Sequence, residues 1–195
     1  EVTRQAWRPA AIAVGVAVAA TIGGHLGGSL LVDRGEPIDV AVVQGGGPQN
    51  TRADLCTTRA VFERHMQASA TITSDVDLVL WPEDVVHPAS DSAITPGRCD
   101  QDLLRLAEAS DRLSRLAADL DAVIVSGWFE RAEDGTANLN YSLAQSPDGT
   151  ITGRYDKVRL VPFGEYVPLR SLIERFSGEL PARDVRPGTD EAVLQ

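Results

Sequence analysis

The hydrophobic and polar positions along the chain separate a glycine-rich apolar stretch from a longer region of alternating strands and helices. Residues 10–32 contain no Asp, Glu, Lys or Arg, and as a helix at about 1.5 Å per residue they would span roughly 35 Å. Gly23 and Gly27, like Gly24 and Gly28, have the G-x-x-x-G spacing that lets helices pack closely. The pattern predicts a membrane span; a buried glycine-rich helix and a signal peptide are the alternatives.

The charges on either side of the predicted span indicate its orientation. Arg4 and Arg8 precede the span and mainly acidic residues follow it, so the positive-inside rule places the N-terminus in the cytoplasm. We expect residues 1–36 to form the transmembrane helix with its flanks, and residues 37–195 to form an extracytoplasmic domain. Because the sequence starts on Glu1 and ends in an apolar run, we expect a segment of a longer protein whose second domain is incomplete at its C-terminus.

Beyond residue 37, apolar runs and helical periodicity alternate as they do in α/β domains. Short apolar runs predict strands at residues 38–44, 76–81, 122–129, 139–145 and 150–156. Apolar residues at helical spacing predict helices at residues 52–70 and 100–120. Strands that are first linked by helices and then by hairpins predict a mixed sheet covered by helices.

The composition excludes several classes of function. The 195 residues include 18 basic and 28 acidic side chains, for a net charge of -10, which argues against a nucleic-acid surface. Cys56 and Cys99 lack metal-site spacing, and they either pair in an oxidising compartment or remain separate core thiols. The absence of an H-E-x-x-H helix and of a G-x-S-x-G elbow removes most support for a zinc hydrolase or a serine hydrolase.

Two charged residues follow predicted strands, where such sheets place their active sites. Lys157 comes after the fifth strand and is the only lysine in the chain, although arginine is frequent. A compact, rotatable ammonium differs from a planar guanidinium in chemistry and in shape, so we expect a role that arginine cannot fill. Glu83 follows the second strand. The alternatives are that lysine is rare by chance and that Glu83 is an ordinary solvated loop residue.

The sequence around these residues resembles a known family. Residues 81–83 (Trp-Pro-Glu) and 155–157 (Tyr-Asp-Lys) resemble the nitrilase superfamily. Within it, the string Leu-Val-Pro-Phe-Gly-Glu-Tyr-Val-Pro at residues 160–168 is similar to the apolipoprotein N-acyltransferases, and residues 43–49 resemble their opening strand and loop. The resemblance extends over residues 38–187, and the arginine- and alanine-rich composition suggests an actinobacterial type.

The resemblance implies an αββα sandwich with a Glu-Lys-Cys triad. Glu83 would be the general base that takes the thiol proton, and Lys157 would stabilise the oxyanion that forms when the thiolate attacks an acyl carbon. Glu165 matches a second glutamate near the triad and would keep Lys157 charged, unless it is simply an exposed loop residue. Aromatic side chains are expected as pocket walls: Trp81, Phe163 and Tyr166.

The implied reaction transfers an acyl chain from a phospholipid to the nucleophilic cysteine, and then to the amino group of a lipoprotein's diacylglyceryl-cysteine. The implied partners are a phospholipid, a diacylated lipoprotein and the cell membrane, with no metal or organic cofactor. A carbon–nitrogen hydrolase of the same superfamily and a catalytically dead, membrane-anchored binding module are the alternatives.

Two departures from the family pattern limit what this chain does by itself. No cysteine follows Cys99, whereas the family's nucleophile lies beyond the lysine motif. We therefore expect the nucleophile beyond Gln195 and an inactive fragment. In the opening loop, many members carry a Lys-Trp pair where this chain has Arg52-Ala53, so no role for a loop tryptophan is expected.

Overall fold

The structure of the protein is a computed structural model that describes residues 15–21, 23, 35–48, 55–89, 103–176 and 180–189. Contacts divide the chain into two units, Glu1–Pro37 and Ile38–Gln195. In the first unit, residues 15–21 are helical. Among the described residues, no helix is long and apolar enough to cross a membrane, and most of the predicted span lies outside them.

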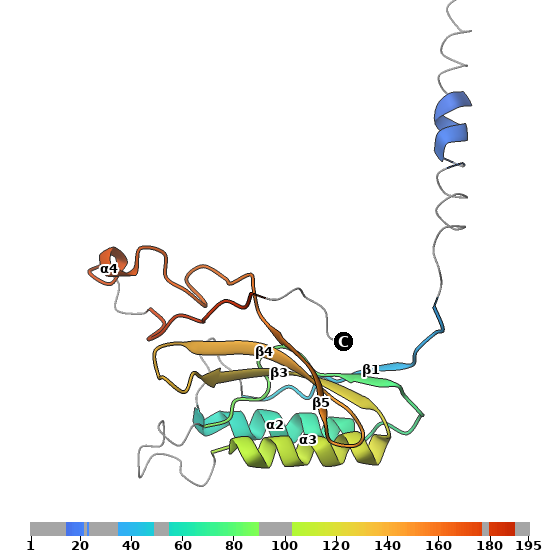
Figure 1. Cartoon of the computed structure of the whole chain (residues 1–195), viewed down its shortest axis with the longest axis horizontal. Helices are drawn as coiled ribbons and strands as arrows, with labels where there is room; N and C mark the ends of the chain where they lie inside the picture. Colours follow the sequence, from blue (N-terminus) through green and yellow to red (C-terminus); the bar gives the residue numbers. More distant parts are fainter. Residues whose placement is uncertain are drawn as a thin grey trace, which may run out of the picture. The chain divides into compact units, whose positions relative to one another are not determined.

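The second unit contains one mixed sheet of five strands, in agreement with the predicted α/β class (Figure 1). Their order across the sheet is the order in sequence: β1 (Val40–Val42), β2 (Leu78–Leu80), β3 (Val123–Arg131), β4 (Asn138–Gln145) and β5 (Ile151–Asp156). The first three strands are parallel, and β4 and β5 are added by two antiparallel hairpins. Because each hairpin reverses the chain, the C-terminal ends of β2 and β5 lie at the same edge of the sheet.

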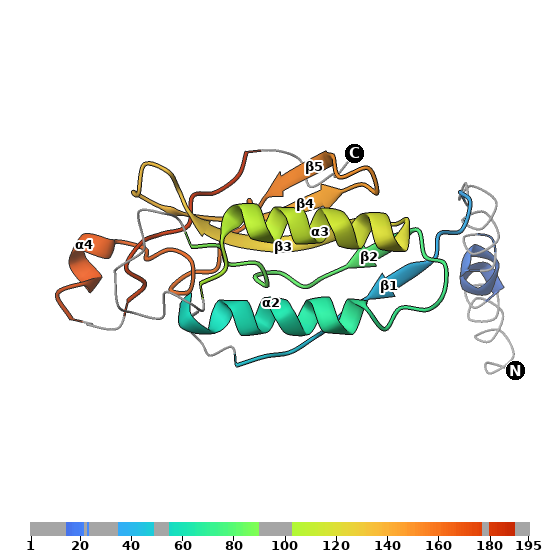
Figure 2. The same cartoon turned by 90° about the horizontal axis from the view of Figure 1, so that it is seen from below.

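Two long helices, α2 (Leu55–Ser69) and α3 (Leu106–Leu120), lie side by side on one face of the sheet (Figures 1 and 2). They are the connections from β1 to β2 and from β2 to β3. The strands β1, β2 and β3 follow one another in one direction across the sheet. Because crossovers between parallel strands are right-handed, both helices lie on the same face. A short helix, α4 (Arg170–Ile173), follows the sheet.

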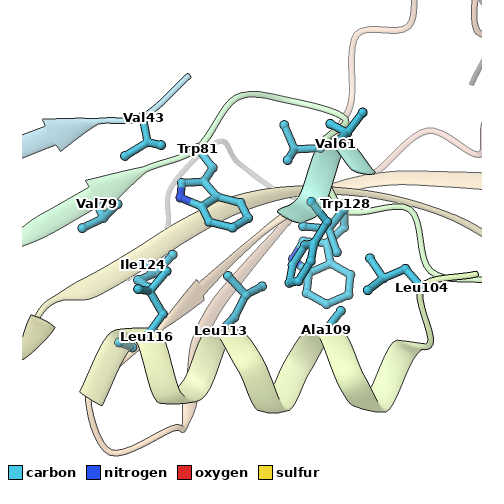
Figure 3. Close-up of a cluster of buried hydrophobic side chains, with 14 of the residues drawn as sticks. Val43, Val61, Val79, Trp81, Leu104, Ala109, Leu113, Leu116, Ile124 and Trp128 are labelled. Atoms are coloured by element: carbon cyan, nitrogen blue, oxygen red, sulfur yellow. The ribbon is translucent and has the colours of Figure 1, made fainter. Parts of the chain in front are cut away.

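The hydrophobic core fills the space between the sheet and these two helices (Figure 3). Val79 of β2 and Ile124 of β3 are completely buried there. Phe62 of α2 meets Trp81 edge to face with ring centroids 5.8 Å apart, a favourable geometry for two aromatic rings. The indole N–H of Trp81 donates to the hydroxyl of Ser69 over 2.9 Å. Trp81 is therefore a core residue, and its predicted role as a pocket wall is wrong.

Helix α3 begins later than the sequence pattern predicts. The pattern suggested a start near residue 100, but the helix begins at Leu106, and residues 100–102 lie outside the described residues. The carbonyl of Leu104 accepts a hydrogen bond from the backbone N–H of Ala89 over 2.8 Å, and Arg105 is extended with φ -90° and ψ 146°. Pairing with a neighbouring segment therefore replaces the first predicted helical turn.

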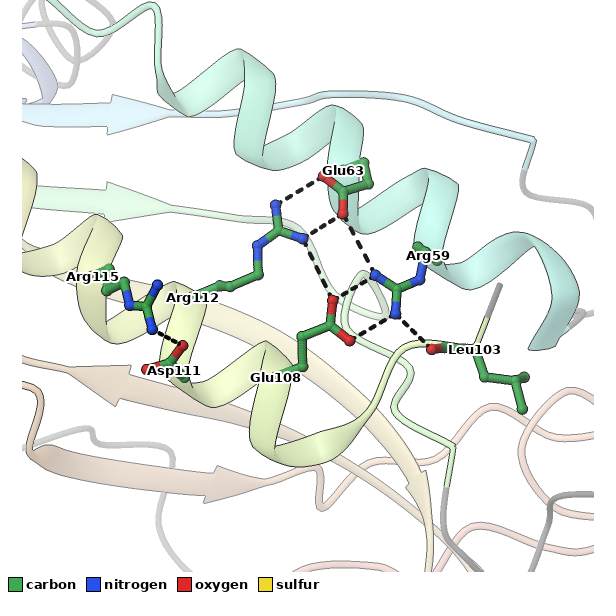
Figure 4. A network of polar contacts seen from close by, with 7 residues as sticks. All are labelled: Arg59, Glu63, Leu103, Glu108, Asp111, Arg112 and Arg115. Atoms are coloured by element: carbon green, nitrogen blue, oxygen red, sulfur yellow. Dashed lines mark hydrogen bonds and ion pairs between the residues drawn. The ribbon is translucent and has the colours of Figure 1, made fainter. Parts of the chain in front are cut away.

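Outside the core, an ion-pair network joins α2 to α3 (Figure 4). Arg59 binds both carboxylate oxygens of Glu108 over 2.5 and 2.7 Å, and Arg112 does the same with Glu63. The guanidinium of Arg112 also lies over the ring of Phe62, 5.0 Å from its centroid. The network thus links the two helices and covers part of the core.

Cys56, near the start of α2, is disulfide-bonded. The sequence has one other cysteine, Cys99, which lies outside the described residues. Disulfides persist in oxidising compartments. The extracytoplasmic position of the domain stays a prediction.

Candidate active site

The three residues singled out in the sequence meet at one edge of the sheet. Lys157 directly follows β5, Glu83 follows β2, and Glu165 lies in the loop after Lys157. The ammonium nitrogen of Lys157 lies 2.7 Å from Oε1 of Glu83 and 3.0 Å from Oε1 of Glu165. Because the C-terminal ends of β2 and β5 share an edge, residues far apart in the sequence form one compact group of charges.

A buried asparagine connects all three of these residues. The side-chain amide of Asn140, at the start of β4, donates to Oε1 of Glu83 over 2.7 Å and to Oε1 of Glu165 over 2.8 Å. Its backbone carbonyl accepts the N–H of Lys157 over 2.9 Å. Asn140 is only 4% exposed, so burial limits its movement and fixes the two carboxylates around the ammonium.

Sequence reasoning missed Asn140, although one signal was present. The β4–β5 register pairs Tyr141 with Asp156, so Asn140 lies beside Lys157 across the two strands. Asn140 and Ser142 alternate with the core residue Tyr141, and they therefore face away from the helix-covered side of the sheet. Once the hairpin has been predicted, its register shows that Asn140 is a polar residue beside the catalytic candidate Lys157. That position would have identified Asn140 as a candidate site residue.

The turn that carries Glu83 passes very close to β3. The backbone N–H groups of Val85 and Val86 both donate to the carbonyl of Gly127, over 3.2 and 3.0 Å. A Cβ built on Gly127 would lie 2.5 Å from the carbonyl oxygen of Pro82 and 2.6 Å from Cα of Glu83. Only glycine allows this approach, so β3 sets the position of the Glu83 backbone.

The same turn contains a residue in an uncommon conformation. Asp84 has a positive φ of 63°, which is sparsely populated by residues other than glycine. Its carboxylate pairs with the buried imidazole of His87, and that ring stacks on Phe129 with centroids 5.1 Å apart. The pairing with His87 holds Asp84 in this conformation, directly after Glu83.

A tightly closed loop holds Glu165. Its Oε2 accepts the N–H of Val161 over 2.7 Å, and its own N–H donates to the carbonyl of Val161 over 2.8 Å. The carbonyl of Glu165 accepts the N–H of Val185 over 2.6 Å. The side chain of Glu165 is 14% exposed, so it is a fixed, largely buried group rather than the solvated loop residue that was the alternative.

The contacts determine the protonation of Glu83 and Lys157. Burial opposes ionisation of Glu83, but hydrogen bonds from Lys157 and Asn140 outweigh it and lower the pKa of its carboxyl group. Burial likewise opposes the charged form of Lys157, but hydrogen bonds to Glu83 and Glu165 outweigh it and raise the pKa of the amine. At neutral pH, Glu83 is therefore a carboxylate that can accept a proton, and Lys157 is an ammonium.

Glu83 and Lys157 line a hollow of about 580 Å³ on the surface of the domain. Its lining comes from the turn after β2, from β4, and from β5 with the residues that follow it: Glu83, Asn140, Tyr141, Ser142, Tyr155, Lys157, Val158 and Arg159. Phe163 and Tyr166, which we expected as pocket walls, are not among these described lining residues. The described residues contain no group of three or more His, Cys, Asp or Glu side chains placed to hold a metal ion.

Comparison with known proteins identifies the family. The carbon–nitrogen hydrolase family matches residues 39–193. The chain is 35% identical over 167 residues to an apolipoprotein N-acyltransferase of Geobacter metallireducens, covering 82% of this chain and 29% of that protein. It is 31% identical over 164 residues to one of Pseudomonas paraeruginosa, covering 83% of this chain and 29% of that protein. The chain thus spans less than a third of the length of these relatives.

Among solved structures, the chain is similar to an amidase from Nesterenkonia sp. The two are 19% identical with a TM-score of 0.48, and the likeness covers 82% of this chain and 51% of that one. The match to the family extends over most of the sequence, from the residue before β1 to beyond the loop that holds Glu165. The chain belongs to the carbon–nitrogen hydrolase family.

Proposed function

We propose that the protein containing this chain is an apolipoprotein N-acyltransferase, which moves an acyl chain from a phospholipid to the N-terminal diacylglyceryl-cysteine of lipoproteins. The observation that carries the proposal is the ammonium of Lys157, held between Glu83 and Glu165 beside an open hollow. The similarity to proteins named apolipoprotein N-acyltransferase supports transfer to an amine.

In the first half-reaction, Glu83 takes the proton of a cysteine thiol, and the thiolate attacks the ester carbonyl of the phospholipid. Lys157 stabilises the resulting oxyanion, because its ammonium is charged and already in place. When the tetrahedral intermediate collapses, the C–O bond breaks, the lysophospholipid leaves with the proton returned by Glu83, and a thioester remains on the cysteine.

In the second half-reaction, the α-amino group of the lipoprotein cysteine attacks the thioester. Glu83 takes a proton from the attacking nitrogen and returns it to the departing thiolate, so the amide forms and the thiol is restored. Glu165 remains an electrostatic partner of Lys157 throughout, because its hydrogen bonds to Val161 and Asn140 hold it in the loop.

The nucleophile is proposed to be a cysteine outside residues 1–195. Cys56 is disulfide-bonded and so offers no thiolate, which is the reactive form of cysteine. No cysteine lies between Lys157 and Gln195. We also propose that the helix-covered sheet is half of an αββα sandwich, whose other half is completed by residues outside this sequence.

Exposed apolar side chains near the site support a membrane-bound substrate. The segment from Val158 to Phe176 carries six of them: Val158, Val161, Phe163, Leu169, Leu172 and Phe176. Apolar groups gathered on a surface mark sites of membrane or protein contact. Together with the apolar residues 10–32, they support a multi-pass protein of the cell membrane that presents this domain outside the cytoplasm.

The test is acyl transfer by the complete, purified protein. The protein is incubated with phospholipid vesicles and a synthetic diacylated lipopeptide, and the product is followed by mass spectrometry. We expect a mass gain of one acyl chain on the lipopeptide amine, and a thioester on the enzyme when the lipopeptide is omitted. Hydrolysis of simple amides without acyl transfer would favour the carbon–nitrogen hydrolase alternative. The absence of any turnover would favour a binding module.

A further inference from the structure

One basic side chain in the hollow has no counter-ion among the residues that the structure describes. Of the charged residues that line it, Glu83 and Lys157 pair with each other. Arg159 lines the same hollow and is exposed, and it forms no hydrogen bond or ion pair within the part of the chain that the structure describes. Most other arginines described in this domain pair with a carboxylate, as Arg154 does with Asp156.

Two hydroxyl groups lie in the same hollow as Arg159. Ser142 and Tyr155 are directly opposite each other in the β4–β5 ladder, and both line the hollow. Neither hydroxyl forms a hydrogen bond within the described residues. The hollow therefore combines a guanidinium, which donates in a planar fork, with two neutral donors, a combination that suits an anion with several oxygens.

We propose that Arg159 forms an anion subsite that holds the phosphodiester group of the phospholipid acyl donor, with Ser142 and Tyr155 as additional donors. This inference rests on the proposed function. A guanidinium binds phosphate oxygens two at a time, which an ammonium does not do, so the two cations in the hollow have different tasks. Lys157 faces the reacting carbonyl, and Arg159 faces the headgroup.

The spacing of the two cations suits a glycerophospholipid. Arg159 is two residues beyond Lys157, so their Cα atoms are separated by at most about 7 Å of extended chain. In the donor, only the glycerol carbons and their oxygens separate the reacting ester from the phosphate. Binding the phosphate at Arg159 therefore places the ester carbonyl near the ammonium, and it favours lipids that carry a phosphodiester over neutral acyl esters.

The test compares two acyl donors with the complete protein. One donor is a phospholipid in vesicles, and the other is a p-nitrophenyl acyl ester, which has no phosphate. Acyl-enzyme formation is measured over a range of donor concentrations for wild type, Arg159→Gln and Arg159→Lys. The control is Arg64→Gln, because Arg64 is exposed on α2 and lines neither this hollow nor the site.

For Arg159→Gln, we expect the apparent KM for the phospholipid to rise by roughly ten- to a hundredfold, as for loss of a charged hydrogen bond. The KM for the p-nitrophenyl ester should stay within about twofold of wild type, Arg159→Lys should recover part of the loss, and Arg64→Gln should match wild type with both donors. An equal effect of Arg159→Gln on both donors, or no effect on either, would overturn the subsite.

A third arm separates the lipid headgroup from free phosphate as the ligand. Inorganic phosphate is added to the ester assay at millimolar concentration. If it inhibits wild type but not Arg159→Gln, while the phospholipid KM is the same in both, Arg159 binds free phosphate and the donor subsite is wrong. Failure of the proposed function would look different: wild type itself would transfer no acyl chain from phospholipid to lipopeptide, which would overturn both proposals.

Discussion

Gly127 lies directly against Glu83: a Cβ on Gly127 would come to 2.6 Å from Cα of Glu83. The other atoms nearest to that Cβ also belong to the backbone, namely the carbonyl oxygen of Pro82 and the nitrogen of Asp84. Backbone atoms cannot rotate away as a flexible side chain can. The position of the proposed general base therefore depends on the absence of a side chain on a neighbouring strand.

Gly127→Ala should displace the Glu83 turn and reduce the rate of acyl-enzyme formation. A displacement of about 1 Å at a catalytic group costs on the order of a hundredfold in rate. The measurement is single-turnover thioester formation, with circular dichroism to confirm folding. Gly35→Ala is the matched control, because a Cβ there meets nothing within 4 Å. A folded Gly127→Ala variant with the wild-type rate would contradict the argument.

Asn140→Ala should move the acid limb of the pH–rate profile to higher pH. The amide of Asn140 helps to lower the pKa of Glu83, and activity requires the ionised carboxylate, so activity is present above that pKa and lost below it. Removing the amide takes away one of the hydrogen bonds that lower this pKa, so the pKa rises and the acid limb moves to higher pH.

Asn140→Asp should shift the acid limb further in the same direction, because a third carboxylate would face Glu83 and Glu165. The profiles of both variants are measured as thioester formation between about pH 4 and 9. If the rate falls but the acid limb stays at the wild-type pH in both variants, Asn140 supports the fold and does not tune Glu83.

Lys157→Arg should abolish thioester formation although it keeps the positive charge. The ammonium fits between two carboxylate oxygens at 2.7 and 3.0 Å, and the larger planar guanidinium cannot occupy the same position. Loss of one oxyanion donor costs about a hundred- to a thousandfold in rate. Lys157→Met is the uncharged comparison, and near-normal thioester accumulation in Lys157→Arg would show that Lys157 has a structural role.

The ion pairs between α2 and α3 should contribute to stability at neutral pH. Hydrogen bonds from Arg59 lower the pKa of Glu108, and those from Arg112 lower the pKa of Glu63. Lowered carboxyl pKa values stabilise the fold above the unfolded-state pKa, and this stabilisation is lost as the pH falls through the folded-state value. Glu108→Gln should therefore lower the free energy of unfolding at pH 7 and have less effect below about pH 4.

The size of the Arg59–Glu108 contribution is obtained from a double-mutant cycle by urea unfolding. We expect a coupling energy of about 0.5–1 kcal/mol that decreases in high salt, because both side chains are partly exposed. Arg115 and Asp111, an exposed pair within α3, provide the comparison and should give a smaller coupling energy. Equal coupling energies for the two pairs would show that an ion pair between two helices contributes no more to stability than an exposed pair within one helix.

Reduction of the disulfide at Cys56 should destabilise the domain. A disulfide that closes a long loop contributes about 2–4 kcal/mol, mainly by restricting the unfolded chain. Without reductant, Cys56 should resist alkylation by iodoacetamide, and with reductant it should be labelled and the unfolding midpoint should fall. Labelling of Cys56 in the unreduced, folded protein, read by peptide mapping, would contradict the bond.

The two hairpin strands show how far local pattern determines the fold. Residues 139–145 and 150–156 were predicted as strands, and β4 and β5 occupy nearly the same residues, because alternation and turn residues are local signals. The start of α3 was not predictable in the same way. Helical periodicity continues through Leu103 and Leu104, but pairing with Ala89, a segment distant in sequence, decides the conformation there.

The sequence by itself determined the α/β class, the family, and Glu83, Lys157 and Glu165 as candidates, because motifs and periodicity are properties of short segments. The tertiary structure alone decided which groups surround them. Asn140 and Gly127 meet Glu83 only after the strands align. Only the folded domain shows that Arg159 lines the hollow with no counter-ion among the described residues. Such relationships depend on distances between segments remote in sequence, which only the packed sheet defines.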